Sequence, residues 1–305
     1  MNKETKILKN LLSVYWLRPE TAIWRTLDAI QLQKIKFIRP IVDIGCGDGI
    51  FTFSTFGGKV DANYDVYRTM RKTDKFFSGI DIHDQTSKIS FKITRKPERD
   101  IDLGLDWKKN LLTKAKKLKN YQKLIKHDAN KQLPIEKNAF KTVFSNTFYW
   151  LNDIRHILNE AKRICHESGK IVIFVPDKKF QESLIFNQYF SKKQKWAKML
   201  DRGISNNIKH CYSLNEWKNI FSEVGLRVSH HSNYGTEQLV KFWSVGLRPY
   251  SPFLIEMANN LNLKTRTKIK QKLVRDLTPL LKSYLDFELT KIGKNNCFHL
   301  FVLKK

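Results

Sequence analysis

Apolar and polar positions alternate between residues 41 and 176 in a pattern that predicts a parallel α/β sheet. Short apolar, β-branched runs are typical of buried strands, and the stretches between them carry apolar residues on one helical face. Chains that alternate strands and helices in this way form parallel sheets covered by helices. The expected strands lie at residues 41–45, 101–106, 123–127, 142–146 and 170–175, and two later runs at 226–229 and 297–303 extend the sheet.

Two helices are expected between these strands. Residues 107–118 and 153–165 each repeat apolar side chains every three or four positions, which is the spacing of a helix with one buried face. The pair Ser168-Gly169 is expected to end the second helix, because glycine tolerates the left-handed conformation of a helix cap.

A third helix is expected at residues 213–224. Ser213 and Glu216 have the spacing of a capping box, in which each side chain accepts a hydrogen bond from the backbone of the other residue. Gly225 follows and is expected to end this helix.

Four segments lie outside the expected sheet and its connecting helices. Residues 1–38 are predicted to be a helical N-terminal extension, so the main domain is expected at residues 39–305. Residues 57–100 are expected to be an insertion between the first two strands. Residues 177–212 and 235–295 are predicted to be helical insertions that form the substrate site or its lid, because α/β proteins build pockets beyond the carboxyl ends of their strands.

The most informative motif is the run IVDIGCGDGIF at residues 41–51. An apolar strand that carries Asp43 leads into glycines at alternate positions and then into a helix. Such glycines allow a tight turn and a close approach by a ligand, with the helix N-terminus behind it. A dinucleotide site would have the longer spacing G-x-G-x-x-G. The shorter spacing and the acid on the strand favour a ligand that carries an amine.

With this strand, acid and glycine turn, the chain resembles the class I S-adenosylmethionine-dependent methyltransferases, in particular the UbiE/COQ5-like, methyltransferase domain 11 group. The resemblance implies a Rossmann-like, seven-stranded, mostly parallel sheet of order 3-2-1-4-5-7-6, whose last strand is antiparallel. It also implies that S-adenosylmethionine is the cofactor. By this resemblance, the residues that bind its amino-acid part are Asp43, Gly45, Cys46, Gly47 and Gly49.

The family also has an acid at the end of the second strand, which binds the ribose hydroxyls. Asp106 and Asp81 compete for this role, and each follows a glycine and an apolar residue. The next family element, Asp128-Ala129, lies 22 positions beyond Asp106 but 47 beyond Asp81. Because the family separates the two elements by one helix and one strand, Asp106 is preferred, with Trp107 beside it.

Asp128 and Ala129 resemble the pair that contacts the adenine in this family, and a loop-capping aspartate is the alternative for Asp128. Ser145 and Asn146 end the fourth strand and are expected to contact the cofactor next to its methyl group. The aromatic residues 148–150 either line the pocket or pack in the core. Enzymes that methylate the amines of nucleic-acid bases usually carry two prolines here, and their absence counts against an adenine or cytosine acceptor.

A hydroxyl acceptor would benefit from a base with a pKa near neutrality. His156 and His210 are the candidates for this base by their positions, and a structural or surface role is the alternative for both. The catalytic residues are otherwise unknown.

The preferred acceptor is a small molecule or a glycan. Residues 242–249 resemble extensions of bacterial methyltransferases of surface-polysaccharide or lipid-linked sugar synthesis. The basic and aromatic side chains of Trp243, Arg248 and Tyr250 would suit a sugar phosphate or a lipid carrier at a membrane face. An RNA or protein methyltransferase is the alternative, and the intact glycines and acids disfavour a non-catalytic, cofactor-binding scaffold.

Composition changes this interpretation little. The net charge is +27, but the lysines are spread along the chain without arginine-rich aromatic clusters, so nucleic-acid binding stays open without being favoured. Four scattered cysteines predict reduced thiols and no metal site. No apolar run approaches the ~20 residues of a membrane-spanning helix. We therefore expect a soluble, cytoplasmic protein and leave a peripheral contact with the inner membrane face open.

Overall fold

The computed structural model describes residues 2–68, 90–189, 201, 204, 208–246, 250–294 and 296–305. The chain begins with two packed helices, α1 (Lys3–Val14) and α2 (Pro19–Gln33). The Asn2 side chain caps α1 by accepting a hydrogen bond from the Thr5 N–H at 3.0 Å. Pro19 lies in the first turn of α2, where a residue without an N–H loses no helical hydrogen bond.

The centre of the molecule is a seven-stranded sheet of order β5-β4-β1-β6-β7-β9-β8. In the order of the chain this is 3-2-1-4-5-7-6, which confirms the predicted topology. The strands pair in parallel from β5 to β7, and β9 runs antiparallel to both β7 and β8. The strands are β1 (Ile41–Ile44), β4 (Ile101–Asp106), β5 (Tyr121–Lys126), β6 (Phe140–Ser145), β7 (Cys165–Pro176), β8 (Arg227–Tyr234) and β9 (Phe298–Lys304).

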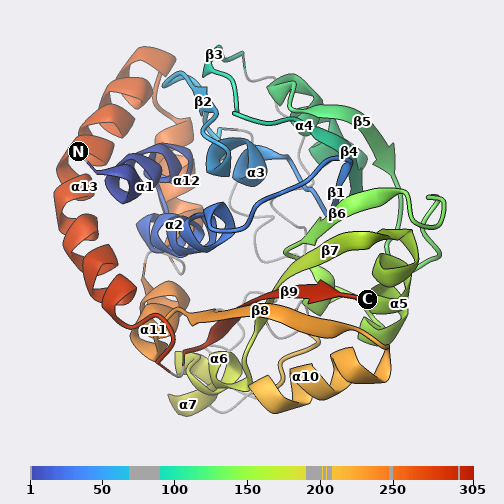
Figure 1. Ribbon diagram of the computed structural model, residues 1–305. Helices are drawn as coiled ribbons and strands as arrows, with labels where there is room; N and C mark the ends of the chain where they lie inside the picture. Colours follow the sequence, from blue (N-terminus) through green and yellow to red (C-terminus); the bar gives the residue numbers. More distant parts are fainter. Residues whose placement is uncertain are drawn as a thin grey trace.

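Both faces of the sheet are covered by apolar cores, as expected for parallel strands. On one face, Val172 and Phe174 of β7 join a core that contains the inner sides of α1, α2 and the long C-terminal helix α13 (Leu263–Thr290). On the other face, Ile171 and Ile173 pack with α5 (Ile154–Ile164) and α10 (Leu214–Glu223). Figure 1 shows the same division, with α1, α2 and α13 on one side of the sheet and α5 and α10 on the other.

The remaining elements surround this sheet. Between the first two strands of the sheet, a short antiparallel pair forms from β2 (Lys59–Val60) and β3 (Ile93–Arg95). The helices that follow β1, β4, β7 and β8 connect the strands or lie beyond them. They are α3 (Ile50–Thr55), α4 (Lys109–Leu118), α6 (Lys178–Glu182), α7 (Ile185–Tyr189), α11 (Glu237–Val245) and α12 (Ser251–Asn259), and a 3-10 turn, η3, spans Phe148–Trp150.

Two predicted local signals at helix α10 are confirmed. The Ser213–Glu216 capping box forms at the start of α10. Gly225 then ends the helix with a left-handed φ of +69°. Asp153 caps α5 by accepting from the backbone N–H groups of Arg155 and His156. The four cysteines are free thiols.

The predicted end of α5 at Ser168-Gly169 is wrong. The helix ends at Ile164, and β7 begins at Cys165 without a connecting loop. Gly169 lies inside β7, where the register with β6 shifts between Cys165 and Lys170. A Cβ on Gly169 would lie 2.8 Å from the Cys165 sulfur and 2.9 Å from the His166 carbonyl oxygen. The glycine is therefore needed for close packing at a strand irregularity, not for a helix cap.

Candidate functional site

The glycine turn between β1 and α3 has left-handed backbone at all three glycines. The φ angles of Gly45, Gly47 and Gly49 are +77°, +60° and +73°. A Cβ on Gly45 would lie 2.1 Å from the Thr147 hydroxyl, and one on Gly49 would lie 2.8 Å from the Tyr121 ring. A Cβ on Gly47 would meet no atom within 4 Å. Two of the glycines are thus required by packing, whereas Gly47 presents bare backbone to open space, as a cradle for a ligand would.

The Asp106 carboxylate braces this turn from the end of β4. It accepts hydrogen bonds from the backbone N–H of Gly47 at 2.9 Å and of Lys108 at 2.8 Å. Burial raises the pKa of Asp106, and these two N–H donors act against that shift. Because β4 pairs directly with β1, Asp106 ends the second strand as expected, and its predicted contact with the ribose stays a prediction. The competing Asp81 lies outside the described residues.

Asp43 lies beneath the turn with internal partners. The Tyr121 hydroxyl donates to its Oδ2 at 2.7 Å, and the Tyr121 oxygen lies 2.7 Å from the Thr52 hydroxyl. The carboxyl is 2% exposed, and its burial raises the pKa to about 7 although the hydrogen bond from Tyr121 opposes the shift. The predicted contact of Asp43 with a ligand amine stays a prediction. Sequence reasoning missed Tyr121, because its partner lies 78 positions away.

The other half of the predicted cofactor site lies at the carboxyl ends of β4 and β5. Asp128 Oδ1 accepts from the backbone N–H of Asn130 at 3.0 Å and from its side-chain amide at 2.8 Å. The backbone contact is the main reason that the pKa of Asp128 is lowered. Asp128 and Ala129 are half-buried, and Trp107 is 63% exposed with the Lys108 ammonium 5.1 Å from its ring centroid. Asp128 therefore caps its loop, and its predicted adenine contact stays a prediction.

Ser145 and Asn146 lie where β6 ends beside β1. Ser145 is fully buried, and its hydroxyl donates to the Ile44 carbonyl at 2.8 Å. It therefore fixes the position of the turn and contacts internal groups, whereas Asn146 is half-buried. Cys46 is half-buried too, and burial raises the pKa of its thiol well above the ordinary value.

The aromatic residues after β6 mostly belong to the core. Phe148 is fully buried, and Tyr149 is 6% exposed with its ring 5.8 Å from that of Phe298. Trp150, at 42% exposed, is the one of the three with an accessible ring. The core alternative therefore holds for Phe148 and Tyr149.

Helix α2 and the residue before it carry a polar face that sequence reasoning missed. Arg18, Thr21, Arg25 and Asp28 recur every three or four positions, so they project from one side. We call these four residues the α2 polar face. Arg25 lies 5.3 Å from the ring centroid of Phe51 in α3 and pairs with Asp28 at 3.0 Å. The α2 polar face therefore lies beside the helix that begins at the glycine turn.

In the part of the chain that the structure describes, three polar atoms on and next to this face are buried without a partner. They are the Nη2 atom of Arg18, the Oγ1 atom of Thr21 and the Oε2 atom of Glu20, although Arg18 Nε and Glu20 Oε1 pair at 2.8 Å. An unpaired buried polar atom costs about 1–3 kcal/mol. The spacing of these residues is visible in the sequence, but the burial of their unpartnered atoms is seen only in the structure.

The two predicted histidines do not stand out as bases. His210 has both ring nitrogens engaged, with Nε2 2.9 Å from the Leu151 carbonyl and Nδ1 3.0 Å from the Tyr212 hydroxyl. Burial lowers the pKa of His210. His156 lies on α5, and its Nε2 atom is buried without a partner. The role of either residue as a base stays a prediction.

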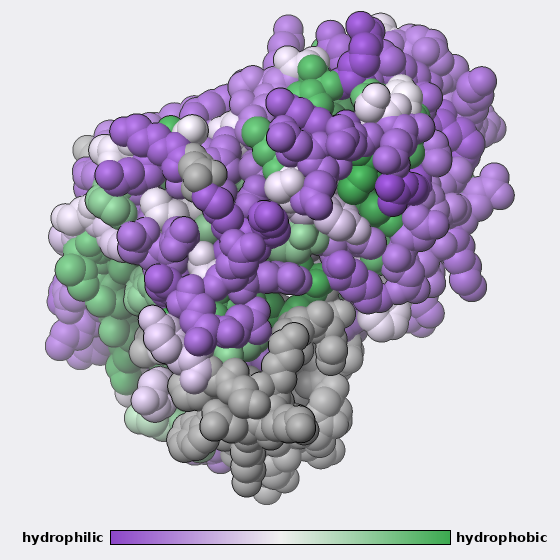
Figure 2. Space-filling model, turned by 90° about the horizontal axis from the view of Figure 1, so that it is seen from below, coloured by the Kyte–Doolittle hydropathy of each residue, from purple (hydrophilic) through white to green (hydrophobic). Residues whose placement is uncertain are grey.

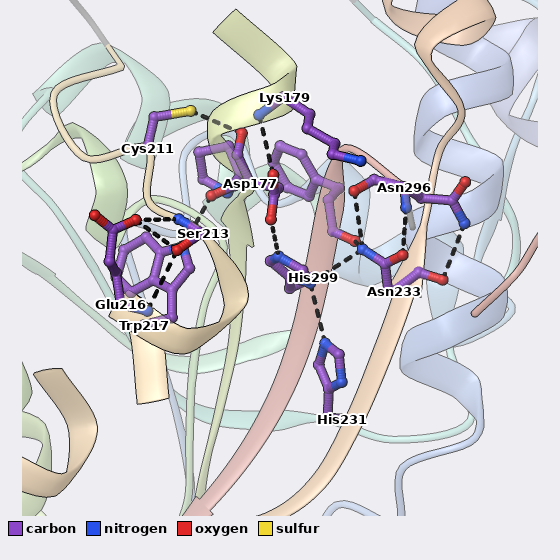
Figure 3. Close-up of polar contacts among 12 residues, drawn as sticks. Asp177, Lys179, Cys211, Ser213, Glu216, Trp217, His231, Asn233, Asn296 and His299 are labelled. Carbon is purple, nitrogen blue, oxygen red and sulfur yellow. Dashed lines mark hydrogen bonds and ion pairs between the residues drawn. The ribbon is translucent and has the colours of Figure 1, made fainter. Parts of the chain in front are cut away.

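A second polar network lies at the same edge of the sheet (Figure 3). Asp177, directly after β7, contacts His299 Nε2 at 2.9 Å, and His299 Nδ1 lies 3.0 Å from His231 Nε2. The Asn233 amide also lies 3.1 Å from His299 Nδ1. His299 is 1% exposed, and burial, followed by the nearby His299, lowers the pKa of His231 to about 4. Because both ring nitrogens of His299 have internal partners, its role in the described structure is to join β7, β8 and β9.

The described residues contain no group of three or more His, Cys, Asp or Glu side chains arranged to hold a metal ion. Among the same residues, no helix is both long enough and apolar enough to cross a membrane.

Part of the chain matches a known protein family. Residues 100–173 match a family described as "Methyltransferase domain", which covers β4 to β7. No curated protein has a matching sequence. Similar solved structures include S-adenosylmethionine-dependent methyltransferases from three bacteria. That from Thermotoga maritima is 15% identical with a TM-score of 0.43, and the match covers 70% of this chain and 75% of that one.

The other two structures cover more of this chain. The protein from Mesorhizobium loti is 12% identical with a TM-score of 0.41, over 87% of this chain and 90% of that one. The protein from Geobacter sulfurreducens, in complex with S-adenosyl-L-homocysteine, is 13% identical with a TM-score of 0.43, over 92% and 89%. At these identities and TM-scores the similarities assign no acceptor to the chain.

Proposed function

We propose that this chain, whose residues 100–173 match a methyltransferase domain and whose sheet has the strand order expected for class I enzymes, transfers a methyl group from S-adenosylmethionine to a polar small molecule or a glycan. The cofactor supplies an electrophilic methyl group on a sulfonium, which an acceptor atom attacks in line as the carbon–sulfur bond breaks. The acceptor loses a proton, and S-adenosylhomocysteine leaves. The protein contributes binding and alignment.

The cofactor fits the glycine turn and its surroundings. The open space beside Gly47 leaves its backbone accessible to a ligand. The Asp106 carboxylate accepts a hydrogen bond from the Gly47 N–H and so fixes the position of the turn. We propose that Asp106 binds the ribose and that Asp128 and Ala129 bind the adenine, in keeping with their places at the ends of β4 and β5. UbiE/COQ5-like membership stays a prediction.

The α2 polar face is the observation that carries the proposed acceptor. Its unpartnered atoms, together with Glu20 Oε2, offer both hydrogen-bond donors and an acceptor in a buried setting. A ligand with several hydroxyl groups would satisfy them, because each hydroxyl both donates and accepts. Arg25, 26% exposed and beside α3, would hold such a ligand next to the cofactor.

A peripheral membrane contact is a further part of the proposal. The exposed apolar residues Phe253 and Met257 lie on α12 and Leu280 lies on α13, at 53%, 66% and 66% exposed. Figure 2 shows a mostly hydrophilic face with apolar residues in more than one place, one group of them toward the side on which α13 lies in Figure 1. Arg248 of the predicted basic-aromatic surface lies outside the described residues.

Two isosteric variants of α2 test the acceptor site. Thr21→Val removes a hydroxyl without a protein partner, whereas Thr26→Val removes one that donates to the Ala22 carbonyl at 2.7 Å. We expect Thr21→Val to lower kcat/KM for the acceptor by about tenfold, since one hydrogen bond to a ligand is worth about 1–1.5 kcal/mol. Thr26→Val should leave kcat/KM nearly unchanged, and both variants should bind S-adenosylmethionine as the wild type does.

The acceptor itself is identified by transfer of a labelled methyl group into a cell extract that is separated into small molecules, glycans, RNA and protein. Label in the small-molecule or glycan fraction supports the proposal. Label confined to RNA or protein would overturn it, and so would an equal loss of activity in the two threonine variants.

A further inference from the structure

A groove with a volume of about 410 Å³ lies between α1, β2 and α13. These three elements are neighbours at the periphery of the molecule in Figure 1. We call this the basic groove, because five of its lining residues are cationic and none of the described residues that line it is acidic. The cationic residues are Lys6, Lys9, Lys59, Lys270 and Arg275.

The charges of the basic groove are largely uncompensated. Among the described residues, Lys6, Lys9 and Lys59 form no ion pair. Arg275 pairs with Asp276 at 2.7 Å on the exposed side of α13. Lys270 is 2% exposed and donates to the carbonyl oxygens of Ala62 and Tyr64. The acids Asp61 and Asp65 attract Lys270, but neither lines the groove.

A second surface pocket shows that basic composition alone does not produce such a groove. It has a volume of about 440 Å³ and is also rich in cations. There, however, Lys305 pairs with Glu167 at 2.9 Å and Arg163 pairs with Glu160 at 2.8 Å. Lys162 donates to the Val224 carbonyl at 2.9 Å. Three of its four cations are therefore matched by internal partners, whereas among the described residues Lys6, Lys9 and Lys59 form no ion pair.

The clustering of cations in the basic groove has an electrostatic cost. The pKa of Lys59 is lowered, first by partial burial and then by the charges of Arg95, Lys6 and Lys9. Cations that lie close together repel one another, and a bound anion would offset this repulsion because it attracts each of them. The side chains of Asn10, Ser13 and Gln271 add neutral hydrogen-bonding groups to the lining.

We propose that the basic groove binds a phosphate-bearing ligand. Lysine ammonium groups bind phosphate as point charges. The volume is at the small end of the range of small-molecule pockets, about 300–1,000 Å³, so it suits a compact group. The ligand is either a soluble diphosphate or the headgroup of an anionic lipid. The described residues that line the basic groove include none of the glycine turn or of the α2 polar face. This site therefore does not depend on the proposed acceptor.

Two triple variants with the same change in charge test the proposal. The groove variant is Lys6→Gln/Lys9→Gln/Lys59→Gln. The control is Lys137→Gln/Lys218→Gln/Lys304→Gln, at exposed positions away from the groove. Binding of inorganic pyrophosphate is measured by calorimetry, and co-sedimentation is measured with phosphatidylcholine vesicles with and without phosphatidylglycerol. Circular dichroism and S-adenosylmethionine binding establish that each variant is folded.

We expect the wild type and the control to bind pyrophosphate or the anionic vesicles, and the groove variant to bind at least about tenfold more weakly. If the groove variant loses binding of pyrophosphate, the ligand is a soluble diphosphate. If it loses only the binding of vesicles that contain phosphatidylglycerol, the ligand is a lipid headgroup. Equal weakening in both variants would overturn the proposal, because it would reflect net charge alone. Absence of binding to both probes would also overturn it. A 20-nucleotide RNA is a third probe, and the proposal would likewise fail if the wild type bound only this RNA and both variants bound it equally well.

Discussion

At the scale of single residues, the glycine turn meets two separate demands. Gly45 and Gly49 are required because a side chain on either would collide with Thr147 or Tyr121. Gly47 has no such neighbour, so packing alone does not explain it. Its left-handed φ of +60° by itself favours glycine, and its open side leaves room for the proposed ligand.

The variant Gly47→Val tests this distinction. A β-branched side chain at positive φ strains the backbone by about 1–2 kcal/mol, and here it would also fill the space proposed for the cofactor. We expect a loss of S-adenosylmethionine binding of at least about a hundredfold by calorimetry, because displacement of the ligand costs several kcal/mol, while the protein stays folded.

Gly293→Val is the matched control for backbone strain. Gly293 has a φ of +82° and also meets no atom within 4 Å of a built Cβ, but it lies between α13 and β9. It should lose similar stability and keep its affinity for S-adenosylmethionine. Unchanged binding by Gly47→Val would contradict the placement of the cofactor at the turn.

At the scale of elements, α13 is joined to the segment after β2 by buried charges. Arg266 pairs with Asp65 at 2.7 Å, with side chains 3% and 5% exposed, and the guanidinium lies 5.5 Å from the Trp16 ring centroid. Lys270, one turn further along α13, holds the Tyr64 carbonyl. The last long helix, the N-terminal helices and the insertion between β1 and β4 therefore depend on one another.

Removal of Asp65 tests this connection. Asp65→Ala leaves the Arg266 guanidinium buried without its partner, and we expect a loss of about 3–5 kcal/mol in the free energy of unfolding. Asp276→Ala removes the acid of an exposed pair on the same helix, 72% and 48% exposed, and should cost at most about 1 kcal/mol. Urea unfolding measures both. Similar losses in the two variants would argue against a structural role for the buried pair.

At the scale of the whole molecule, stability depends on pH through buried acids at the carboxyl edge of the sheet. The pKa of Asp43 is raised from 3.8 to about 7 in the folded protein, mainly by burial. Between pH 3.8 and about 7, Asp43 has lost its proton in the unfolded chain but keeps it in the folded protein. The contribution of Asp43 is therefore fully present below pH 3.8 and is lost as the pH rises toward 7.

We expect the free energy of unfolding of the wild type to fall, relative to that of Asp43→Asn, by roughly 1.4 kcal/mol for each pH unit between 4 and 7. Urea unfolding followed by tryptophan fluorescence across this range measures the difference. Asp102→Asn gives the opposite sign, because contacts with Arg39 and Ile41 lower the pKa of Asp102 and its contribution is lost as the pH falls. A pH-independent difference for Asp43→Asn would contradict its burial as a carboxyl group.

Local patterns were sufficient for much of the fold. The period of the strands, the Ser213–Glu216 capping box and the glycine turn each depend on residues close together in the chain, and the structure contains them all. The order of the strands followed from the resemblance that this turn carries. The role of Gly169 was predicted wrongly, because a helix cap and a strand irregularity both favour glycine and only the neighbours decide between them.

The sequence by itself determined the strands, the glycine turn and, through them, the cofactor. Only the tertiary structure placed Tyr121 against Asp43, turned the α2 polar face toward α3 and brought Lys59 to the lysines of α1. These features join residues far apart in the chain, and burial and the pairing of charges arise only when the elements pack. That is why the sequence indicates the chemistry of the cofactor, whereas the proposed acceptor site and the basic groove depend on packing.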